Sequence, residues 1–210
     1  MNESIQKLIK PVLVRWLCKC KWIRHNSEDM NKLWLESDER YGVIEFYDAD
    51  EYAPEDILEL TGYDKQTGKR IYYLHFELHD LSFVLDRLGN FFAFIYGGEQ
   101  MAVDSSISGQ EEHTPVKSVA FCCTSGWTST HFAEKIQEIF DEKNINIKVH
   151  AGDYTEMETI VQENDRVLLA PQIGYMLPEL KRQYGDKIEV VETGDFATQN
   201  FDHIVEKLIA

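Results

Sequence analysis

The chain has 210 residues, 43% of them hydrophobic and 12% aromatic, which suits a packed core and argues against wholesale disorder. Its 37 acidic and 21 basic residues give a formal charge of -16, so nucleic acid is not the expected partner, because phosphate backbones are recognised by basic surfaces. No apolar run reaches the ~18 residues of a membrane span, and no signal-peptide pattern opens the chain. Four cysteines in two tight pairs make no disulfide framework, so we expect reduced thiols and a cytoplasmic location.

The first 24 residues are basic and apolar. They hold one acid, Glu3, against six cations: Lys7, Lys10, Arg15, Lys19, Lys21 and Arg24. We expect one or two amphipathic helices here, whose polar side is either simply solvated or in contact with anionic lipid.

The rest of the first hundred residues has a mixed pattern. Three segments rich in aromatic and β-branched residues are predicted strands: Tyr41–Tyr47, Arg70–Leu78 and Phe91–Tyr96. Asp80–Leu88 is a predicted helix, and Glu55 with Asp56 is interpreted as the charge at a helix start. Residues 1–103 are therefore predicted to form a smaller α+β domain, whose role the sequence does not indicate.

A polar stretch with Gly, Ser and Pro, residues 104–115, is the expected interdomain linker. Beyond it, short apolar runs alternate with helical periodicity. The predicted strands are Ser118–Cys122, Ile145–Val149, Val167–Ala170 and Ile188–Val191, and the helices between them include one that Asp153 and Glu156 start as a capping box. The pattern predicts an α/β domain over 116–210, with a four-stranded parallel sheet and helices on both faces.

Chemistry-bearing residues gather just after the first of these strands. Cys123 is followed by a turn rich in hydroxyls that leads into a helix: Thr124, Ser125, Gly126, Trp127, Thr128, Ser129 and Thr130. Open α/β sheets bind ligands at this edge, and the free N–H groups and dipole of a helix start favour an anion. Gly126 lets the backbone approach the anion closely, and the same positive end favours the thiolate of Cys123. The pattern is typical of a nucleophilic thiol that holds phosphate.

Two other interpretations of the cysteines stay open at this point. A cysteine at a strand end is often a buried small hydrophobe, and Cys122 is a competing thiol. Because side chains alternate along a strand, Cys122 is expected on the opposite face, packed under a helix.

The stretch from Lys117 to Ala210 resembles the enzyme IIB component of the lactose/cellobiose class of the bacterial phosphoenolpyruvate:sugar phosphotransferase system. That family carries a phosphocysteine in a Cys-x-x-Gly-x-Ser/Thr-Ser/Thr loop, which Cys123, Gly126, Thr128 and Ser129 match. Its second signature, Pro-Gln followed by Tyr-Met, is matched by four residues: Pro171, Gln172, Tyr175 and Met176. The resemblance covers about 95 residues.

The resemblance implies a phosphotransferase that needs no cofactor and no metal. A IIA histidine would donate phosphate to Cys123, and Cys123 would pass it to a sugar in the membrane permease IIC. It also implies that Pro171, Gln172 and Tyr175 lie beside the phosphate loop, and that the protein is cytoplasmic, or peripheral at the membrane through the permease. The sequence departs from the family at Trp127, His131 and Gly194–Ala197, and its first 112 residues have no counterpart there.

Three alternatives accompany this interpretation. A low-molecular-weight cysteine phosphatase needs an arginine six residues after its cysteine, where this chain has Ser129. A IIB-like domain can instead serve as a non-catalytic sensor of phosphorylation state. A zinc site is conceivable from Cys18 and Cys20 with His25, or from His75 and His79, although Cys-x-Cys spacing is unusual for zinc.

Overall fold

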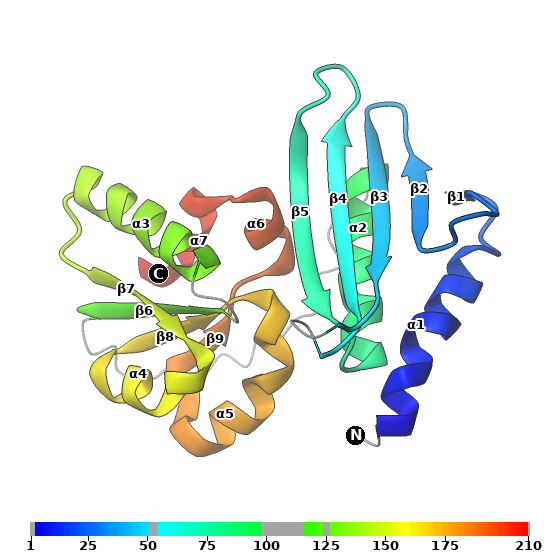
Figure 1. Ribbon diagram of the computed structural model, residues 1–210. Helices are drawn as coiled ribbons and strands as arrows, with labels where there is room; N and C mark the ends of the chain where they lie inside the picture. Colours follow the sequence, from blue (N-terminus) through cyan, green and yellow to red (C-terminus); the bar gives the residue numbers. More distant parts are fainter. Residues whose placement is uncertain (1–2, 51–53, 98–115, 124–126, 210) are drawn as a thin grey trace. The chain divides into compact units, whose positions relative to one another are not determined.

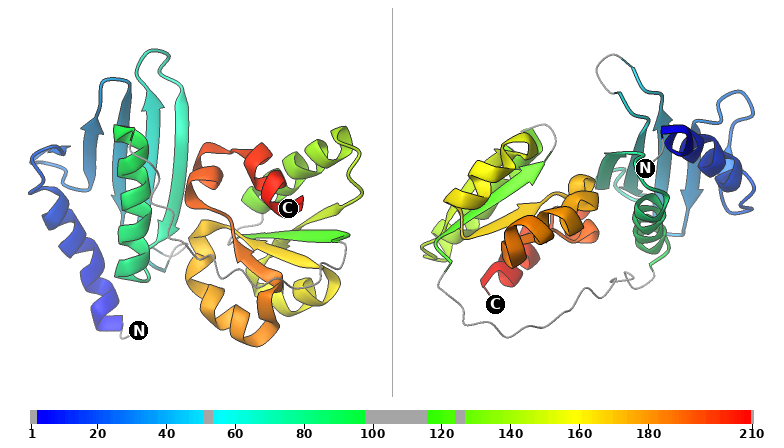
Figure 2. Two further views of the ribbon diagram at one scale, coloured as in Figure 1. Left: turned by 180° about the vertical axis from the view of Figure 1, so that it is seen from behind. Right: turned by 90° about the horizontal axis from the view of Figure 1, so that it is seen from below.

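A computed structural model describes residues 3–50, 54–97, 116–123 and 127–209. The chain divides into two compact units, Met1–Ala102 and Val103–Ala210, which are similar in length (Figures 1 and 2). The expected linker at 104–115 lies outside the described residues and stays a prediction. In the described part of the chain, no helix is both long and apolar enough to cross a bilayer.

The described residues of the first unit form an antiparallel sheet with two helices. Its five strands pair in chain order and are β1 (Arg24–His25), β2 (Lys32–Glu36), β3 (Arg40–Tyr47), β4 (Ile57–Asp64) and β5 (Arg70–Glu77). Helix α1 spans Glu3–Leu17 and lies at the β1 side of the unit, and α2 spans Leu81–Tyr96 and covers one face of the sheet (Figures 1 and 2). The sheet with its two helices makes this unit α+β, as predicted.

Inside this unit the sequence predicted an N-terminal amphipathic helix, here α1, together with β3, β5 and the start of α2, but other elements differ. Phe91–Tyr96 was expected as a strand and instead continues α2, because Val84, Leu88, Phe91 and Ile95 recur at helical spacing and are all buried. Asp80 caps this helix through Phe83 N, and Gly97 ends it with φ 70°. The helix start expected at Glu55–Asp56 is also wrong, since strand β4 follows there, and β2 was not predicted.

The second unit is a parallel α/β fold, as predicted from the sequence. Its strands lie in the order β7-β6-β8-β9 and are β6 (Ser118–Cys123), β7 (Lys148–Asp153), β8 (Arg166–Leu169) and β9 (Ile188–Val190). The helices are α3 (Trp127–Glu142), α4 (Met157–Glu163), α5 (Leu177–Tyr184), α6 (Thr193–Thr198) and α7 (Phe201–Ile209). Its described residues also include short 3₁₀ segments: η1 (Tyr154–Glu156), η2 (Pro171–Met176) and η3 (Gly185–Lys187).

Helices cover both faces of the parallel sheet (Figure 1). On one face, residues of α4 and α5 close a core with alternate side chains of β6, β8 and β9. On the other, Phe132 of α3 stacks on Phe121 of β6 and Phe196 of α6, with ring centroids 4.9 and 4.5 Å apart. Phe201 of α7 meets Phe132 edge to face at 5.0 Å. This aromatic cluster fixes α3, α6 and α7 against the strand that ends at Cys123.

Two details of this unit differ from expectation. The strand predicted at Ile145–Val149 lies at Lys148–Asp153, because Ile145 N bonds Phe140 O and closes the turn after α3 instead of entering the sheet. Helix α6 was not predicted, since Thr193–Thr198 is short and carries no helical repeat of apolar residues. Asp153 does cap the next segment, with its carboxylate accepting from Thr155 N at 2.9 Å, but that segment is the 3₁₀ turn η1, and the predicted helix, α4, begins only at Met157.

Candidate functional site

Cys123 is the last residue of β6, an inner strand of the parallel sheet, and its side chain is buried. In register it pairs with Asp153 at the end of β7, and Ala170 N, just after β8, donates to Cys122 O at 2.8 Å. Three strands therefore end together around this cysteine. This carboxyl edge is where open α/β sheets place their ligands.

The neighbouring thiol, Cys122, points to the other face of the sheet. It belongs to the apolar core formed with Met157 and Ile160 of α4, and it is fully buried. Burial, with smaller contributions from Cys123 and Asp153, raises the pKa of Cys122 to about 12. Cys122 therefore stays a thiol near neutral pH, which makes it a poor nucleophile. The prediction that Cys122 packs under a helix is confirmed.

Cys123 lies on the face that carries Phe121, two residues earlier, under α3 and α6. Helix α3 begins at Trp127, four residues after Cys123. The first N–H groups of an α-helix have no acceptor within the helix itself, and the positive end of the helix dipole lies at the same place. These features are electrostatically suited to an anion on the Cys123 sulfur.

The expected phosphate-binding residues are only partly described. Thr124, Ser125 and Gly126 lie outside the described residues, as does the side chain of Trp127. In the first turn of α3, Thr128 is half-buried, Ser129 is fully buried and Thr130 is exposed. Successive helix positions point about 100° apart, so these three hydroxyls do not all face one point. Their role in binding phosphate stays a prediction.

The second signature lies in η2, directly after β8. Pro171 and Gln172 are buried, and Tyr175 is partly exposed. Gln172 is only 7% exposed, and its Oε1 atom has no hydrogen-bond partner among the described residues. A buried amide without a partner is costly, and its oxygen and nitrogen ends exchange by rotation of the amide. The backbone link from Ala170 to Cys122 holds this amide segment at the end of the strand that carries Cys123.

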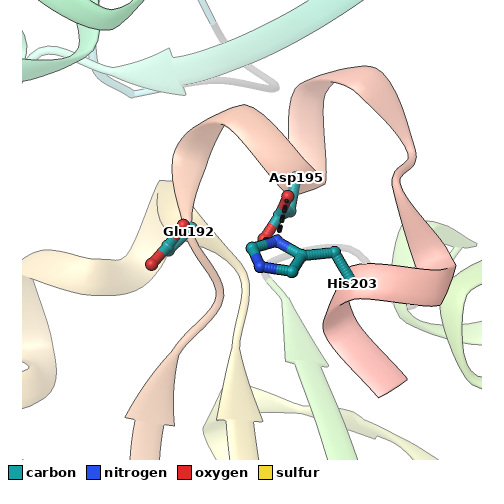
Figure 3. A group of neighbouring side chains, drawn as sticks. All are labelled: Glu192, Asp195 and His203. Atoms are coloured by element: carbon teal, nitrogen blue, oxygen red, sulfur yellow. Dashed lines mark hydrogen bonds and ion pairs between the residues drawn. The ribbon is translucent and has the colours of Figure 1, made fainter. Parts of the chain in front are cut away.

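A further polar group, which the sequence analysis missed, lies after β9 (Figure 3). Asp195 of α6 is 5% exposed, and its carboxylate bonds His203 Nδ1 of α7 at 2.8 Å and Asn200 Nδ2 at 3.2 Å. Glu192 is ion-paired with Lys207. Asp195 and His203 are eight positions apart along the chain, and no motif in the sequence joins them.

Glu192, Asp195 and His203 each offer one ligand atom, and these atoms lie within 4.8 Å of one another. Zinc prefers such donors. However, His203 directs Nδ1 at Asp195, and Lys207 already balances the charge of Glu192, so both carboxylates have partners without an ion. We interpret the group as the polar link between α6 and α7. Among the described residues, neither Cys18 and Cys20 with His25, nor His75 with His79, forms a comparable three-ligand group.

Comparison with known proteins agrees with the resemblance seen in the sequence. Residues 118–207 match the family model described as PTS system, lactose/cellobiose-specific IIB subunit. Among solved structures, the chain is similar to the lactose-specific IIB component domain of the phosphoenolpyruvate:carbohydrate phosphotransferase system from Streptococcus pneumoniae. The identity is 21%, the match covers 45% of this chain and 95% of that chain, and the TM-score is 0.39. The family match falls within the second unit and agrees with the resemblance seen in the sequence, which supports a role in a sugar phosphotransferase system.

Proposed function

We propose that the IIB-type unit is a phosphoryl carrier that holds its cargo on the sulfur of Cys123. The observation that carries the proposal is the placement of Cys123 as the last residue of an inner parallel strand, four residues before the start of a long helix. The other thiol in this unit, Cys122, is committed to the apolar core, and its pKa of about 12 keeps it protonated.

The chemistry would proceed in two transfers. The Cys123 thiolate attacks the phosphorus of a phosphohistidine on a IIA protein, the N–P bond breaks as the S–P bond forms, and the histidine takes up a proton. A sugar hydroxyl in the IIC permease then attacks the same phosphorus, loses its proton to a base, and the thiolate leaves. Phosphoryl transfer requires mainly positioning and stabilisation of charge, which the N–H groups at the start of α3 are suited to provide.

Neutral donors distinguish this site from that of a phosphatase. Residues 124–130 and 170–176 contain no Lys or Arg. A phosphoryl group there would rest on backbone N–H groups, hydroxyls and the amide of Gln172, without a fixed cation that holds it in the ground state. A phosphorylated cysteine that is bound less tightly by its surroundings has a lower activation barrier for transfer of the phosphoryl group to the sugar. This suits a carrier that must release its cargo.

Gln172 is our candidate for a positioning residue in this site. Its amide is buried next to the carboxyl edge of the sheet, and its Oε1 has no partner among the described residues. Rotation of the amide would present N–H donors instead, which a phosphoryl oxygen accepts. Gln172→Glu would place a carboxylate there, and we expect it to slow phosphorylation of Cys123 by about tenfold or more, because like charges repel in a partly desolvated site.

The proposal is tested with a matched pair of variants, Cys123→Ser and Cys122→Ser. The full-length proteins are incubated with phosphoenolpyruvate, the general phosphotransferase proteins and a IIA partner, and the transfer of labelled phosphate is followed. We expect Cys123→Ser to abolish transfer and Cys122→Ser to retain it, with circular dichroism confirming that both are folded. The reverse result would show that Cys122, and not Cys123, carries the phosphoryl group.

The second candidate function is a sensor of phosphorylation state. The observation that favours it is the first unit, whose described residues form a five-stranded sheet with two helices and which lies outside the residues matched by the family. Both functions require phosphate on Cys123, and they differ in the fate of that phosphate. A carrier passes phosphate to sugar when the permease is added and is encoded beside IIA and IIC genes, whereas a sensor retains its phosphate in the presence of permease and sugar.

A further inference from the structure

Helix α1 has an apolar side that the protein does not bury. Leu8, Val12 and Trp16 follow one another at four-residue spacing and are 58%, 54% and 43% exposed. We call these three residues the outward stripe of α1. On the other side of the helix, Ile9, Leu13 and Leu17 are buried in the unit. One apolar side of the helix therefore packs into the unit, and a second apolar side is exposed.

The segment around the outward stripe is cationic. Between Ser4 and Ser27 the chain has six basic residues and no acidic one, while the rest holds 15 basic and 37 acidic residues, a balance of -22. Five of the six cations are exposed: Lys7, Arg15, Lys19, Lys21 and Arg24. The sixth, Lys10, is buried and ion-paired with Asp48 at 2.6 Å, which ties the helix to its own unit.

We propose that the outward stripe of α1 is a binding surface for anionic lipid, with the helix lying in the plane of the membrane interface. Such a surface needs apolar side chains that enter the headgroup region and cations beside them that meet lipid phosphates. Leu8 and Val12 supply the first, Lys7, Arg15 and Lys19 supply the second, and tryptophan is favoured at the interface itself. The proposal does not depend on the phosphoryl chemistry of the second unit.

Charge complementarity favours lipid over a second copy of the chain. A two-fold dimer places the same patch on both sides of its interface, so cations such as Arg15 and Lys19 would face their own copies and repel. An anionic bilayer instead offers an apolar layer and negative headgroups together. The helix lies on the membrane in this proposal, in agreement with the finding that no described helix is suited to span one.

The negative charge of the whole protein does not prevent this contact. Fields between exposed charges fade over a Debye length of about 10 Å at 0.1 M salt. The cations near α1 therefore act on headgroups close to them, while acidic residues farther from the membrane are screened. Raising the salt concentration should release the protein steadily, because part of the attraction is electrostatic.

The test is co-sedimentation of the full-length chain with vesicles of phosphatidylcholine, with and without phosphatidylglycerol. We expect binding to the anionic vesicles that weakens with salt, and little binding to phosphatidylcholine alone. Val12→Glu should weaken binding at least about tenfold, since it puts a carboxylate on the outward stripe. Leu85→Glu is the matched control, because Leu85 is a similarly exposed residue of the other helix, α2, and this variant should bind within about twofold of the unaltered chain.

A second pair tests the charges. Lys19→Gln should weaken binding about fivefold, and Lys69→Gln, on the exposed turn between β4 and β5, should leave it unchanged. Equal binding of Val12→Glu and Leu85→Glu would overturn the proposal. A second result would also overturn it: the unaltered chain does not bind vesicles but forms a dimer in sedimentation-velocity runs, and Val12→Glu dissociates that dimer. The outward stripe would then be an interface between two copies of the chain.

Discussion

The opposite orientation of the two adjacent thiols can be tested through Gly152, the residue that pairs with Cys122 across the sheet. A Cβ at Gly152 would lie 2.5 Å from Ile160 Cδ1 and 3.1 Å from Cys122 Sγ, so a methyl group does not fit beside the core on which Cys122 packs. Overpacking of this kind costs about 1–3 kcal/mol, and we expect Gly152→Ala to destabilise the second unit by that amount.

The clash should be relieved in part by shortening its nearest partner. Ile160→Val removes Cδ1 and alone should cost about 0.5–1.5 kcal/mol. In the double variant the remaining neighbours lie at 3.1 and 3.3 Å, so we expect the combined cost to fall about 1 kcal/mol below the sum of the two single costs. The free energy of unfolding of the second unit is measured for each of these variants by hydrogen exchange of the β6 amides.

Gly89→Ala serves as the control for this cycle. Gly89 lies within α2, and a Cβ there would meet nothing within 4 Å, so the change should stabilise the first unit by about 0.5–1 kcal/mol. Strictly additive costs for Gly152→Ala and Ile160→Val would refute the packing of Cys122 against α4, and with it the assignment of Cys123 to the opposite face.

Three further predictions concern the second unit and its boundary. Because the pKa of Cys122 is raised in the folded unit, the unit should lose stability as pH rises from 9, where the unfolded thiol ionises, towards 12, by at most about 1.4 kcal/mol per pH unit. Cys122→Ala should flatten that slope in pH-dependent hydrogen exchange, and an unchanged slope would contradict the prediction. Phe132→Ala, which removes the centre of the aromatic cluster, should cost about 3–5 kcal/mol by the same exchange measurement, and a loss below about 1 kcal/mol would contradict the packing. Limited proteolysis should cut first between residues 104 and 115 and leave a folded fragment from about Thr114, and an unfolded fragment would show that the domain boundary is wrong.

The parallel sheet was largely predictable because β6, β8 and β9 lie in short, mostly apolar runs bounded by a turn or a helix cap. Strand β7 was predicted three residues too early, since none of its residues is buried and its sequence is not an apolar run. The thiol assignment came from the same regularity: alternation along β6 puts Cys122 and Cys123 on opposite faces, and the structure buries Cys122 under α4. These inferences depend only on residues that are close together along the chain, so they can be made from a single sequence.

The failures came from segments in which distant contacts override local preference. The aromatic residues of Phe91–Tyr96 favour a strand by composition, yet they fill the groove above Gly42 and Gly62, where the sheet has no side chains. Similarly, Asp195 and His203 come together only because α6 turns back over the sheet and meets α7. No local pattern encodes that fold, so nothing in the sequence pairs these two residues.

The central claim is that Cys123 carries the phosphoryl group, and its most direct measurement is mass spectrometry of the unaltered chain. The protein is phosphorylated with phosphoenolpyruvate, the general phosphotransferase proteins and a IIA partner, then digested at the mildly alkaline pH at which thiophosphates persist. We expect one added phosphoryl group on the peptide that contains β6, with fragment ions that place it on Cys123 and leave Cys122 unmodified. Phosphate on Cys122, on His203 or on no residue of the second unit would contradict the account.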